Sequence, residues 1–358
     1  MRIVAIGDAL LPARYMADAL RKINHSENKI TVLSWGEDDE EKLDKRARNL
    51  ELKGPTADSP PAELDDCIAE AELLMVHYCP VSEDLLGRAA KLKILATCRM
   101  GTQNIDVNAA TQLGILAFHV IGRTTEAVSD HTIGLLLCEA RNLARADSAM
   151  KKGIWRKSYI NSASTPELEG KTVGIVGFGE VGRAVLRKLK GFNMRFLVHD
   201  PFVSQSDIAQ CGGIKVGVDE LLPESDFVTL HAVVTPESTN MIGEREIGLM
   251  KPTAYLINTA RSELIDEDAL YKALRDQKIA GAALDVFKDE PLPVDHPLLQ
   301  LDNVTLTPHL ASSTVECLSK SPRLLLYEIL KFLDTADSRF ILNPELLQKY
   351  PPEHFALT

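Results

Sequence analysis

Short runs rich in Val, Ile and Leu alternate with amphipathic stretches along almost the whole chain of 358 residues. This alternation is typical of α/β proteins, in which helices connect parallel strands. In the first third of the chain we expect strands at 2–6, 30–34, 73–78, 93–97 and 114–118. Residues 36–62 are charged and then rich in Pro, which predicts an exposed helix followed by a loop.

The stretch 123–152 contains no Pro, and its apolar positions recur at steps of three and four residues. This pattern predicts one long helix that joins two halves of the chain. A second, more regular series of strands then follows at 172–176, 195–199, 226–230, 253–258, 280–285 and 303–307. Six strands in this rhythm fit a complete doubly wound dinucleotide-binding domain. The segment 313–334 has a helical apolar stripe that is interrupted at Pro322.

A glycine-rich motif lies between the first strand of this series and a helical pattern. It reads Gly177-Phe-Gly179-Glu-Val-Gly182. In that context the first Gly permits a tight turn, the second lets a pyrophosphate approach the backbone, and the third lets helix and strand pack closely. The N-terminus of the helix then presents free N–H groups and the positive end of its dipole to the phosphates.

The next strand ends in an acidic residue, Asp200, placed where a carboxylate accepts hydrogen bonds from the adenosine ribose of a dinucleotide. The same charge repels a 2′-phosphate, and no Arg follows in Asp200-Pro-Phe-Val203. The sequence therefore predicts NAD as the cofactor in preference to NADP.

Composition narrows the possible partners. With 40 Lys and Arg against 51 Asp and Glu, the formal net charge is −11, which argues against binding to nucleic acid or to an anionic membrane. No apolar run approaches the ~18 residues that a membrane-spanning helix requires. The six cysteines are scattered without a CxxC pair, and no His stands at metal-ligand spacing. We therefore expect no metal site, and a reducing, cytoplasmic compartment.

Three segments that follow later strands contain the side chains needed to oxidise a hydroxy acid. They supply Arg261, Glu290 and His309. A guanidinium can bind a substrate carboxylate through its fork of N–H donors. An imidazole can take the hydroxyl proton as hydride leaves, and a neighbouring carboxylate can orient that imidazole.

Taken in order, these motifs carry a family resemblance. They are Gly-Phe-Gly-Glu-Val-Gly, Asn-Thr-Ala-Arg, Gly-Ala-Ala-Leu-Asp-Val-Phe with its Glu-Pro, and Thr-Pro-His-Leu-Ala. Over about residues 70–333 the sequence resembles the D-isomer-specific 2-hydroxyacid dehydrogenases, a family that includes D-3-phosphoglycerate dehydrogenase. The resemblance implies transfer of a hydride between NAD and C2 of a small D-2-hydroxy acid or 2-keto acid. Which acid is used stays open.

The resemblance also implies an architecture of two Rossmann/flavodoxin-like α/β domains with doubly wound parallel sheets and the active site in the cleft between them. Residues 1–119 and 313–358 would form a discontinuous substrate-binding domain, and residues 120–312 an inserted NAD-binding domain. Members of the family usually form homodimers through their cofactor domains, so the helix expected at 123–152 is a plausible dimer element.

Residue roles follow from the same resemblance. Arg261 would bind the substrate carboxylate and polarise the C2 oxygen, with His309 as general acid/base and Glu290 as its partner. The cofactor would be bound by the glycine motif with the backbone of Glu180 and Val181, and by Asp200, Ala232, Thr259, Ala260 and Asp285. The loop that closes over the substrate carboxylate from the other side would be Arg99, Met100 and Gly101.

Two departures from the family pattern concern specificity. Ser262 stands where a Gly usually follows the catalytic Arg, and the loop after Arg99 lacks its usual second Gly. Two alternatives stay open: a non-catalytic NAD-sensing corepressor on the same fold, and a formate-dehydrogenase-like enzyme. The latter uses Gln at the position of Glu290. Of the remaining histidines, His131 lies in the long helix without support for a role, and His231, at a strand end, is ambiguous.

Overall fold

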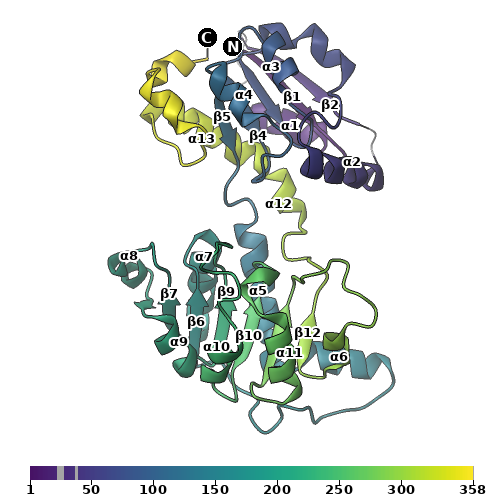
Figure 1. The fold of residues 1–358 in the computed structure, drawn as a ribbon, viewed down its shortest axis with the longest axis vertical. Helices are drawn as coiled ribbons and strands as arrows, with labels where there is room; N and C mark the ends of the chain where they lie inside the picture. Colours follow the sequence, from purple (N-terminus) through teal and green to yellow (C-terminus); the bar gives the residue numbers. More distant parts are fainter. Residues whose placement is uncertain (22–27, 37–38, 358) are drawn as a thin grey trace. The chain divides into compact units, whose positions relative to one another are not determined.

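The computed structural model describes residues 1–21, 28–36 and 39–357, which fold into two compact units (Figure 1). Unit 1 consists of Met1–Arg123 and Thr314–Thr358, and unit 2 of Thr124–Ser313. Unit 2 is therefore inserted into unit 1 in the sequence. Among the described residues, no helix is both long and apolar enough to span a membrane.

Unit 1 is built on a five-stranded parallel sheet with the order β2-β1-β3-β4-β5. Its strands are β1 (Arg2–Gly7), β2 (Lys29–Ser34), β3 (Leu73–Val76), β4 (Ile94–Thr97) and β5 (Leu116–His119). Its helices are α1 (Ala13–Leu20), α2 (Glu40–Lys53), α3 (Glu83–Arg88), α4 (Val107–Gln112), α12 (Val315–Ser319) and α13 (Ser321–Thr335). All five predicted strands are present, with ends that differ by up to two residues. The helix and loop predicted for 36–62 correspond to α2 and the segment after it, and residues 37–38 lie outside the described part.

Both faces of this sheet are buried, which explains the continuous apolar runs in its strands. Along β1, Ile3 and Ala5 belong to one hydrophobic cluster, and Val4 and Ile6 to the other. The first cluster also holds α1 and side chains from the C-terminal segment, namely Leu325, Ile329, Phe332, Phe340 and Phe355. The C-terminal segment thus completes one layer of unit 1. The predicted interruption at Pro322 is the junction of α12 and α13, where Pro stands in the first turn of α13.

Unit 2 is built on a seven-stranded parallel sheet with the order β12-β11-β10-β9-β6-β7-β8. Its strands are β6 (Thr172–Val176), β7 (Arg195–His199), β8 (Ile214–Lys215), β9 (Phe227–Leu230), β10 (Tyr255–Asn258), β11 (Gly281–Leu284) and β12 (Val304–Leu306). Its helices are α5 (Thr125–Arg141), α6 (Leu143–Lys151), α7 (Glu180–Leu189), α8 (Gln205–Gln210), α9 (Val218–Glu224), α10 (Glu244–Leu249) and α11 (Glu267–Arg275). The six predicted strands are confirmed, and the two-residue strand β8 was missed. The doubly wound α/β fold class is confirmed.

The prediction of one helix over 123–152 was wrong, because the helix breaks at Asn142. There the backbone is left-handed, with φ of 55°, and it separates α5 from α6. Asn tolerates this conformation better than most residues, and its N–H caps α5 by donating to the carbonyl of Cys138. The Asn142 side chain accepts from Arg145, whose guanidinium also forms an ion pair with the buried Glu139.

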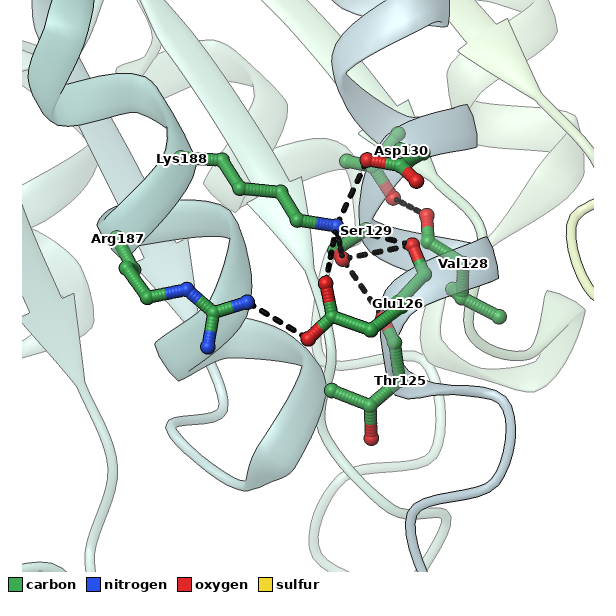
Figure 2. A network of polar contacts seen from close by, with 8 residues as sticks. Thr125, Glu126, Val128, Ser129, Asp130, Arg187 and Lys188 are labelled. Atoms are coloured by element: carbon green, nitrogen blue, oxygen red, sulfur yellow. Dashed lines mark hydrogen bonds and ion pairs between the residues drawn. The ribbon is translucent and has the colours of Figure 1, made fainter. Parts of the chain in front are cut away.

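A network of charged side chains joins α5 to α7 (Figure 2). The Lys188 ammonium donates to Ser129 Oγ and Asp130 Oδ1, both at 2.7 Å. Arg187 donates to a carboxylate oxygen of Glu126 at 2.7 Å. These contacts fix α7 against α5, and α7 is the helix that begins at the glycine motif.

Candidate active site

The predicted site residues of unit 2 gather at one edge of its sheet. All seven strands are parallel, so the residues that follow them come out at the same carboxyl edge, where open α/β sheets bind ligands. The glycine motif follows β6 and Asp200 follows β7. Arg261, Glu290 and His309 follow the neighbouring strands β10, β11 and β12. β6 is flanked by β7 on one side and by β9 on the other, and the order of the strands reverses there. The glycine motif after β6 therefore lies at the switch point of the sheet.

The three glycines of the motif differ in what surrounds them. A Cβ at Gly177, where φ is 91°, would lie 2.4 Å from the backbone nitrogen of Ala232, and a Cβ at Gly182 would lie 2.3 Å from the carbonyl oxygen of Gly177. Both positions are closed to any larger residue. At Gly179 a Cβ would meet no atom within 4 Å. The first turn of α7 begins there without a side-chain cap. Open space in front of an uncapped helix N-terminus fits the pyrophosphate of a dinucleotide.

The Asp200 carboxylate is anchored by backbone donors. It accepts hydrogen bonds from the N–H groups of Phe178 at 2.7 Å, Phe202 at 2.9 Å and Val203 at 3.0 Å. Partial burial acts to raise the pKa of Asp200, but these N–H donors outweigh it, so the pKa is lowered. The group is therefore ionised at neutral pH. A carboxylate has about four acceptor positions, so at least one is left for a ribose hydroxyl.

The imidazole of His309 and the carboxylate of Glu290 form a direct pair. His309 Nδ1 lies 2.8 Å from Glu290 Oε2, and the other carboxylate oxygen of Glu290 accepts from the N–H of Phe287 at 3.0 Å. Since an ionised carboxylate only accepts, Nδ1 carries the proton and Nε2 is the atom left for other chemistry. The His309 side chain is 48% exposed and that of Glu290 is 37% exposed, so a ligand can reach the pair.

The electrostatics of Glu290 match this arrangement. Partial burial acts to raise the pKa of its carboxyl, whereas the hydrogen bonds from His309 and Phe287 and the nearby charges of His309 and Arg261 lower it. The net effect is a lowered pKa. Glu290 therefore keeps its negative charge well below neutral pH.

Arg261 stands at the end of β10 with an exposed guanidinium. One of its nitrogens donates to the carbonyl of Ala260 at 2.7 Å. Among the residues that the structure describes, no carboxylate forms an ion pair with it. The backbone around Arg261 is fixed by the buried Asn258, whose side chain donates to the Arg261 carbonyl at 2.8 Å and accepts from Ala260 N–H at 3.0 Å. A positioned cation with open donors can bind an anionic ligand.

The buried carboxylate of Asp285 positions the loop that bears His309. It accepts from the N–H groups of Leu310 and Ala311, both at 2.8 Å, and from the Thr307 hydroxyl at 2.6 Å. The backbone carbonyl of Asp285 accepts from the N–H of His309 at 2.9 Å. The His309 backbone is left-handed, with φ of 53°, so the loop needs this support.

Sequence reasoning missed the part that His131 takes in this network. Its Nε2 lies 3.1 Å from Thr307 Oγ1. Because the Thr307 hydroxyl donates to Asp285, His131 is the donor in this contact. The sequence offered only a weak signal for this contact, namely the position of His131 on the long predicted helix. In the structure α5 packs across β10, β11 and β12, which brings His131 to Thr307.

The remaining predicted cofactor contacts also lie along the edge. Ala232 packs against Gly177, just after β9. The side chain of Thr259 is buried and turns toward α5, where its hydroxyl lies 2.7 Å from that of Thr132. Only the backbone of Thr259 is thus left to face a ligand. Burial lowers the pKa of the ambiguous His231 to about 3, so this ring is neutral and is not a general acid.

In unit 1, the side chain of Arg99 is already engaged. Its guanidinium stacks 3.9 Å from the ring centre of Tyr78, donates to Glu51 at 2.8 Å and lies 3.4 Å from Asn104 Oδ1. Met100 is exposed, and its carbonyl contacts His119 Nδ1 at 2.9 Å. The Arg99 guanidinium is therefore occupied within unit 1, whereas the Met100 side chain is open to solvent. The neighbouring Cys98 is buried, which raises the pKa of its thiol, so it is an inert thiol.

Comparison with known proteins identifies the family of the chain. Residues 133–311 match the family described as D-isomer specific 2-hydroxyacid dehydrogenase, NAD binding domain. A glyoxylate reductase of Korarchaeum cryptofilum is 37% identical over 317 residues, which cover 87% of this chain and 95% of that protein. A D-3-phosphoglycerate dehydrogenase of Methanocaldococcus jannaschii is 39% identical over 274 residues, and the match spans about half of its length (51%).

Solved structures share the fold. The apo-structure of D-lactate dehydrogenase from Escherichia coli matches with a TM-score of 0.63 and 26% identity, covering 96% of this chain and all of that one. The NAD-complexed D-isomer specific 2-hydroxyacid dehydrogenase of Lactobacillus delbrueckii matches with a TM-score of 0.74 at 22% identity, over 96% of this chain and 100% of that one. The chain belongs to the D-isomer specific 2-hydroxyacid dehydrogenase family and is an NAD-dependent oxidoreductase.

Proposed function

We propose that Arg261, Glu290 and His309 catalyse the reversible oxidation of a small D-2-hydroxy acid to its 2-keto acid. The observation that carries this proposal is the 2.8 Å contact between His309 Nδ1 and Glu290. This contact leaves Nε2 of His309 as the proton-transferring atom, and the Glu290 carboxylate supplies the negative charge that stabilises the protonated ring during the reaction. A glutamine in place of Glu290 would lack that charge, so the pair favours alcohol chemistry over formate oxidation.

The roles in the reaction follow from these contacts. Arg261 binds the C1 carboxylate and polarises the C2 oxygen with its N–H donors. In oxidation, neutral His309 takes the hydroxyl proton at Nε2; in reduction, the protonated ring returns that proton to the oxygen at C2. The chemistry that NAD would supply there, when bound along the glycine motif and Asp200, is acceptance of the hydride from C2 in oxidation and its return to C2 in reduction.

Other contacts of the proposed site concern binding. The backbone of Glu180 and Val181 at the start of α7 would meet the pyrophosphate, and Ala232, Thr259 and Ala260 would line the nicotinamide ribose. Asp285, which holds the His309 loop in place, would lie near the carboxamide. We also propose that unit 1 binds the substrate, with the backbone at Arg99, Met100 and Gly101 contacting its carboxylate.

A shift in the pH profile tests the Glu290–His309 pair. With Glu290→Gln, the His309 ring loses its supporting charge and gives up its proton at lower pH. The rate of keto-acid reduction should then begin to fall at a lower pH than in the wild type. Hydroxy-acid oxidation needs the neutral ring, so its rising limb should also move toward acid. Because the pKa of Glu290 is lowered, its carboxylate stays charged across the neutral range. The difference in rate between wild type and variant should therefore persist there and fade only in strong acid, where Glu290 itself is protonated.

The measurement is kcat/KM against pH in both directions. A control is Glu224→Gln, because Glu224 is an exposed carboxylate that pairs with Arg195 at the start of β7, the end of that strand opposite the carboxyl edge. This control should leave both limbs in place. A uniform loss of rate in Glu290→Gln, with neither limb displaced, would show that Glu290 does not act through His309.

Cofactor preference is a second expected result. The ionised Asp200 opposes a 2′-phosphate, and a like-charge juxtaposition of this kind costs several kcal/mol. We expect kcat/KM for NADH to exceed that for NADPH by about 100-fold or more. Asp200→Asn, which removes the charge, should bring the kcat/KM values for NADH and NADPH closer together. Equal kcat/KM values for the two cofactors in the wild type would show that Asp200 does not exclude the 2′-phosphate.

We also propose that the protein forms a homodimer through unit 2. Apolar side chains are exposed on α6 and the segment after it, namely Leu143, Met150, Ile154, Trp155 and Ile160. Trp155 is 76% exposed, which is costly for a side chain of this size unless a second copy covers it. Ile154→Asp with Trp155→Asp should yield monomers in light scattering, whereas Phe202→Asp, also at an exposed aromatic position, should not. A wild-type protein of monomer mass would refute the proposal.

We place the protein in the cytoplasm. The six cysteines are free thiols, and burial raises the pKa of Cys79, Cys98 and Cys317, so these three remain protonated. Buried, unpaired thiols fit a reducing compartment. Recovery of the protein outside the cytoplasmic fraction of its cells would contradict this location.

A further inference from the structure

One helix of unit 2, α5, makes side-chain contacts with both of the loops that bear Arg261 and His309. The helix packs across β10, β11 and β12, the strands that these loops follow or neighbour. Two consecutive residues of α5, His131 and Thr132, each contact a different loop. All of these residues belong to unit 2. A shared support on one helix therefore bears on how the two loops are placed relative to each other.

The first contact holds the loop of His309. His131 Nε2 lies 3.1 Å from Thr307 Oγ1, and the Thr307 hydroxyl donates to the buried carboxylate of Asp285 at 2.6 Å. Since that hydroxyl has only one proton to give, it accepts the N–H of His131. Thr307 lies two residues before His309, whose N–H donates to the backbone carbonyls of Asp285 at 2.9 Å and Thr307 at 3.0 Å. The His309 loop is thus supported by a chain of hydrogen bonds that begins on α5.

The second contact holds the loop of Arg261 in the same manner. Thr132 Oγ1 donates to the carbonyl of Val128 at 2.7 Å, so in its 2.7 Å contact with Thr259 Oγ1 it is the acceptor. Both threonine side chains are buried, so water does not replace either partner. Thr259 lies two residues before Arg261, as Thr307 does before His309. In each loop, therefore, a threonine hydroxyl two residues ahead of the proposed catalytic side chain is bound to α5.

The same stretch of α5 is fixed to α7, the helix that begins at the glycine motif. Lys188 of α7 donates to Ser129 Oγ and Asp130 Oδ1, both at 2.7 Å, immediately before His131 in the sequence (Figure 2). Four consecutive residues, 129–132, thus contact α7, the loop after β12 and the loop after β10. This segment joins the three parts of the proposed site within unit 2.

We propose that His131 and Thr132 are positioning residues of the reaction. His131 sets the place of the His309 imidazole through Thr307, and Thr132 sets the place of the Arg261 guanidinium through Thr259. This inference rests on the proposed function, because it assigns His131 and Thr132 to the support of the proton-transferring and carboxylate-binding groups named there. A misplacement of about 1 Å at such groups can cost about 100-fold in rate, so a single hydrogen bond behind a loop can matter.

Substitution of His131 tests the first half of the proposal. His131→Leu removes the N–H donor, and we expect kcat to fall about 10-fold in both reaction directions while KM and the Kd of NADH stay within about 3-fold. His131→Gln places an amide N–H near the position of the imidazole Nε2 and should return kcat to within about 3-fold of the wild type. The assays use whichever of glyoxylate, pyruvate and hydroxypyruvate is reduced fastest.

Substitution of Thr132 tests the second half. Thr132→Val keeps the shape of the side chain but removes the oxygen that accepts from Thr259. We expect kcat/KM for the keto acid to fall about 10-fold, with most of the change in KM, because Arg261 binds the substrate carboxylate. Thr132→Ser keeps the hydroxyl and should restore kcat/KM to within about 3-fold of the wild type.

Double-mutant cycles show whether each residue acts through the group assigned to it. In a His309→Gln background, His131→Leu should lower kcat by less than about 2-fold, because the loop no longer carries a proton-transferring group. In an Arg261→Lys background, Thr132→Val should likewise lower kcat/KM by less than about 2-fold. A general loss of folded or active protein would instead reduce the rate equally in both backgrounds.

Thr305→Val is the matched control. It removes another hydroxyl that joins β12 to α5, the donor to the buried Glu139. This variant should have a lower melting temperature but kcat and KM within about 2-fold of the wild type. Should His131→Leu or Thr132→Val not fold, the comparison of His131→Gln and Thr132→Ser with their own double mutants at His309 and Arg261 takes its place, with any loss in the single variant again absent from the double.

The outcomes separate this inference from the proposed function. Unchanged kinetics in His131→Leu or in Thr132→Val, no recovery in the conservative variants, or an undiminished loss in the double mutants overturns the inference and leaves the proposed function intact. An effect at only one of the two residues also overturns the joint assignment to α5. Turnover of none of the three acids contradicts the proposed function, and this inference with it.

Discussion

Replacement of His309 by Gln is expected to lower kcat about 10²- to 10⁴-fold in both reaction directions. The imidazole is the group that exchanges a proton with the C2 oxygen, and an amide cannot take over that exchange. The loss should be present at every pH, because no titration of the variant restores a proton-transferring group. Stopped-flow or steady-state rates with NADH and a 2-keto acid, and with NAD and the hydroxy acid, provide the measurement.

His296→Gln is the matched control for this experiment. His296 also pairs with a glutamate, Glu267, and it precedes a short 3₁₀ turn, but it is not one of the three proposed catalytic residues. We expect its kcat to stay within about 3-fold of the wild type. A His309→Gln enzyme that retains more than about a tenth of wild-type kcat would exclude His309 as the general acid/base.

Arg261→Lys is expected to lower kcat/KM for the acid at least about 100-fold while NADH binding changes little. Lysine keeps the positive charge but loses the planar fork, so the two-point contact with a carboxylate is lost. A fluorescence titration with NADH measures cofactor binding by itself, so an effect of the substitution on cofactor binding can be distinguished from an effect on substrate binding. The comparison variant is Arg245→Lys, which alters an exposed arginine of α10 that pairs with Asp219 and Glu246.

An unchanged kcat/KM in Arg261→Lys would move the carboxylate site elsewhere in the protein. Arg99 is a poor substitute, since Glu51 and Tyr78 already occupy its guanidinium. Arg123 would then be the first alternative, because two of its nitrogens lack partners among the described residues.

The local parts of the site were the most predictable from sequence. The glycine motif could be assigned because each of its steric demands is local: Gly177 and Gly182 have no room for a side chain, and Gly179 opens onto empty space. The strands of both sheets were found because burial on two faces produces continuous apolar runs. The order of Arg261, Glu290 and His309 after successive strands then placed them at one edge, which the sheet order bears out.

What escaped prediction depends on contacts between distant segments. The break at Asn142 lacks the Gly or Pro that usually marks a helix end, and it is supported by Arg145 and Glu139. His131 reaches Thr307 across 176 residues, which no periodicity reveals. The left-handed backbone of His309 is likewise invisible in the sequence, because it is imposed by hydrogen bonds to the carbonyls of Asp285 and Thr307.

The interleaving of the two units determines the order in which they can be completed on the ribosome. Unit 2 is a single stretch, Thr124–Ser313, so all of its strands have been synthesised before the last part of unit 1 emerges. Unit 1 must wait for Phe332, Phe340 and Phe355, which fill one layer over its sheet. Until then the nascent chain carries a finished second unit beside a first unit whose apolar layer is uncovered. Because uncovered apolar surface favours aggregation, we expect the nascent chain to be most prone to aggregate during that interval.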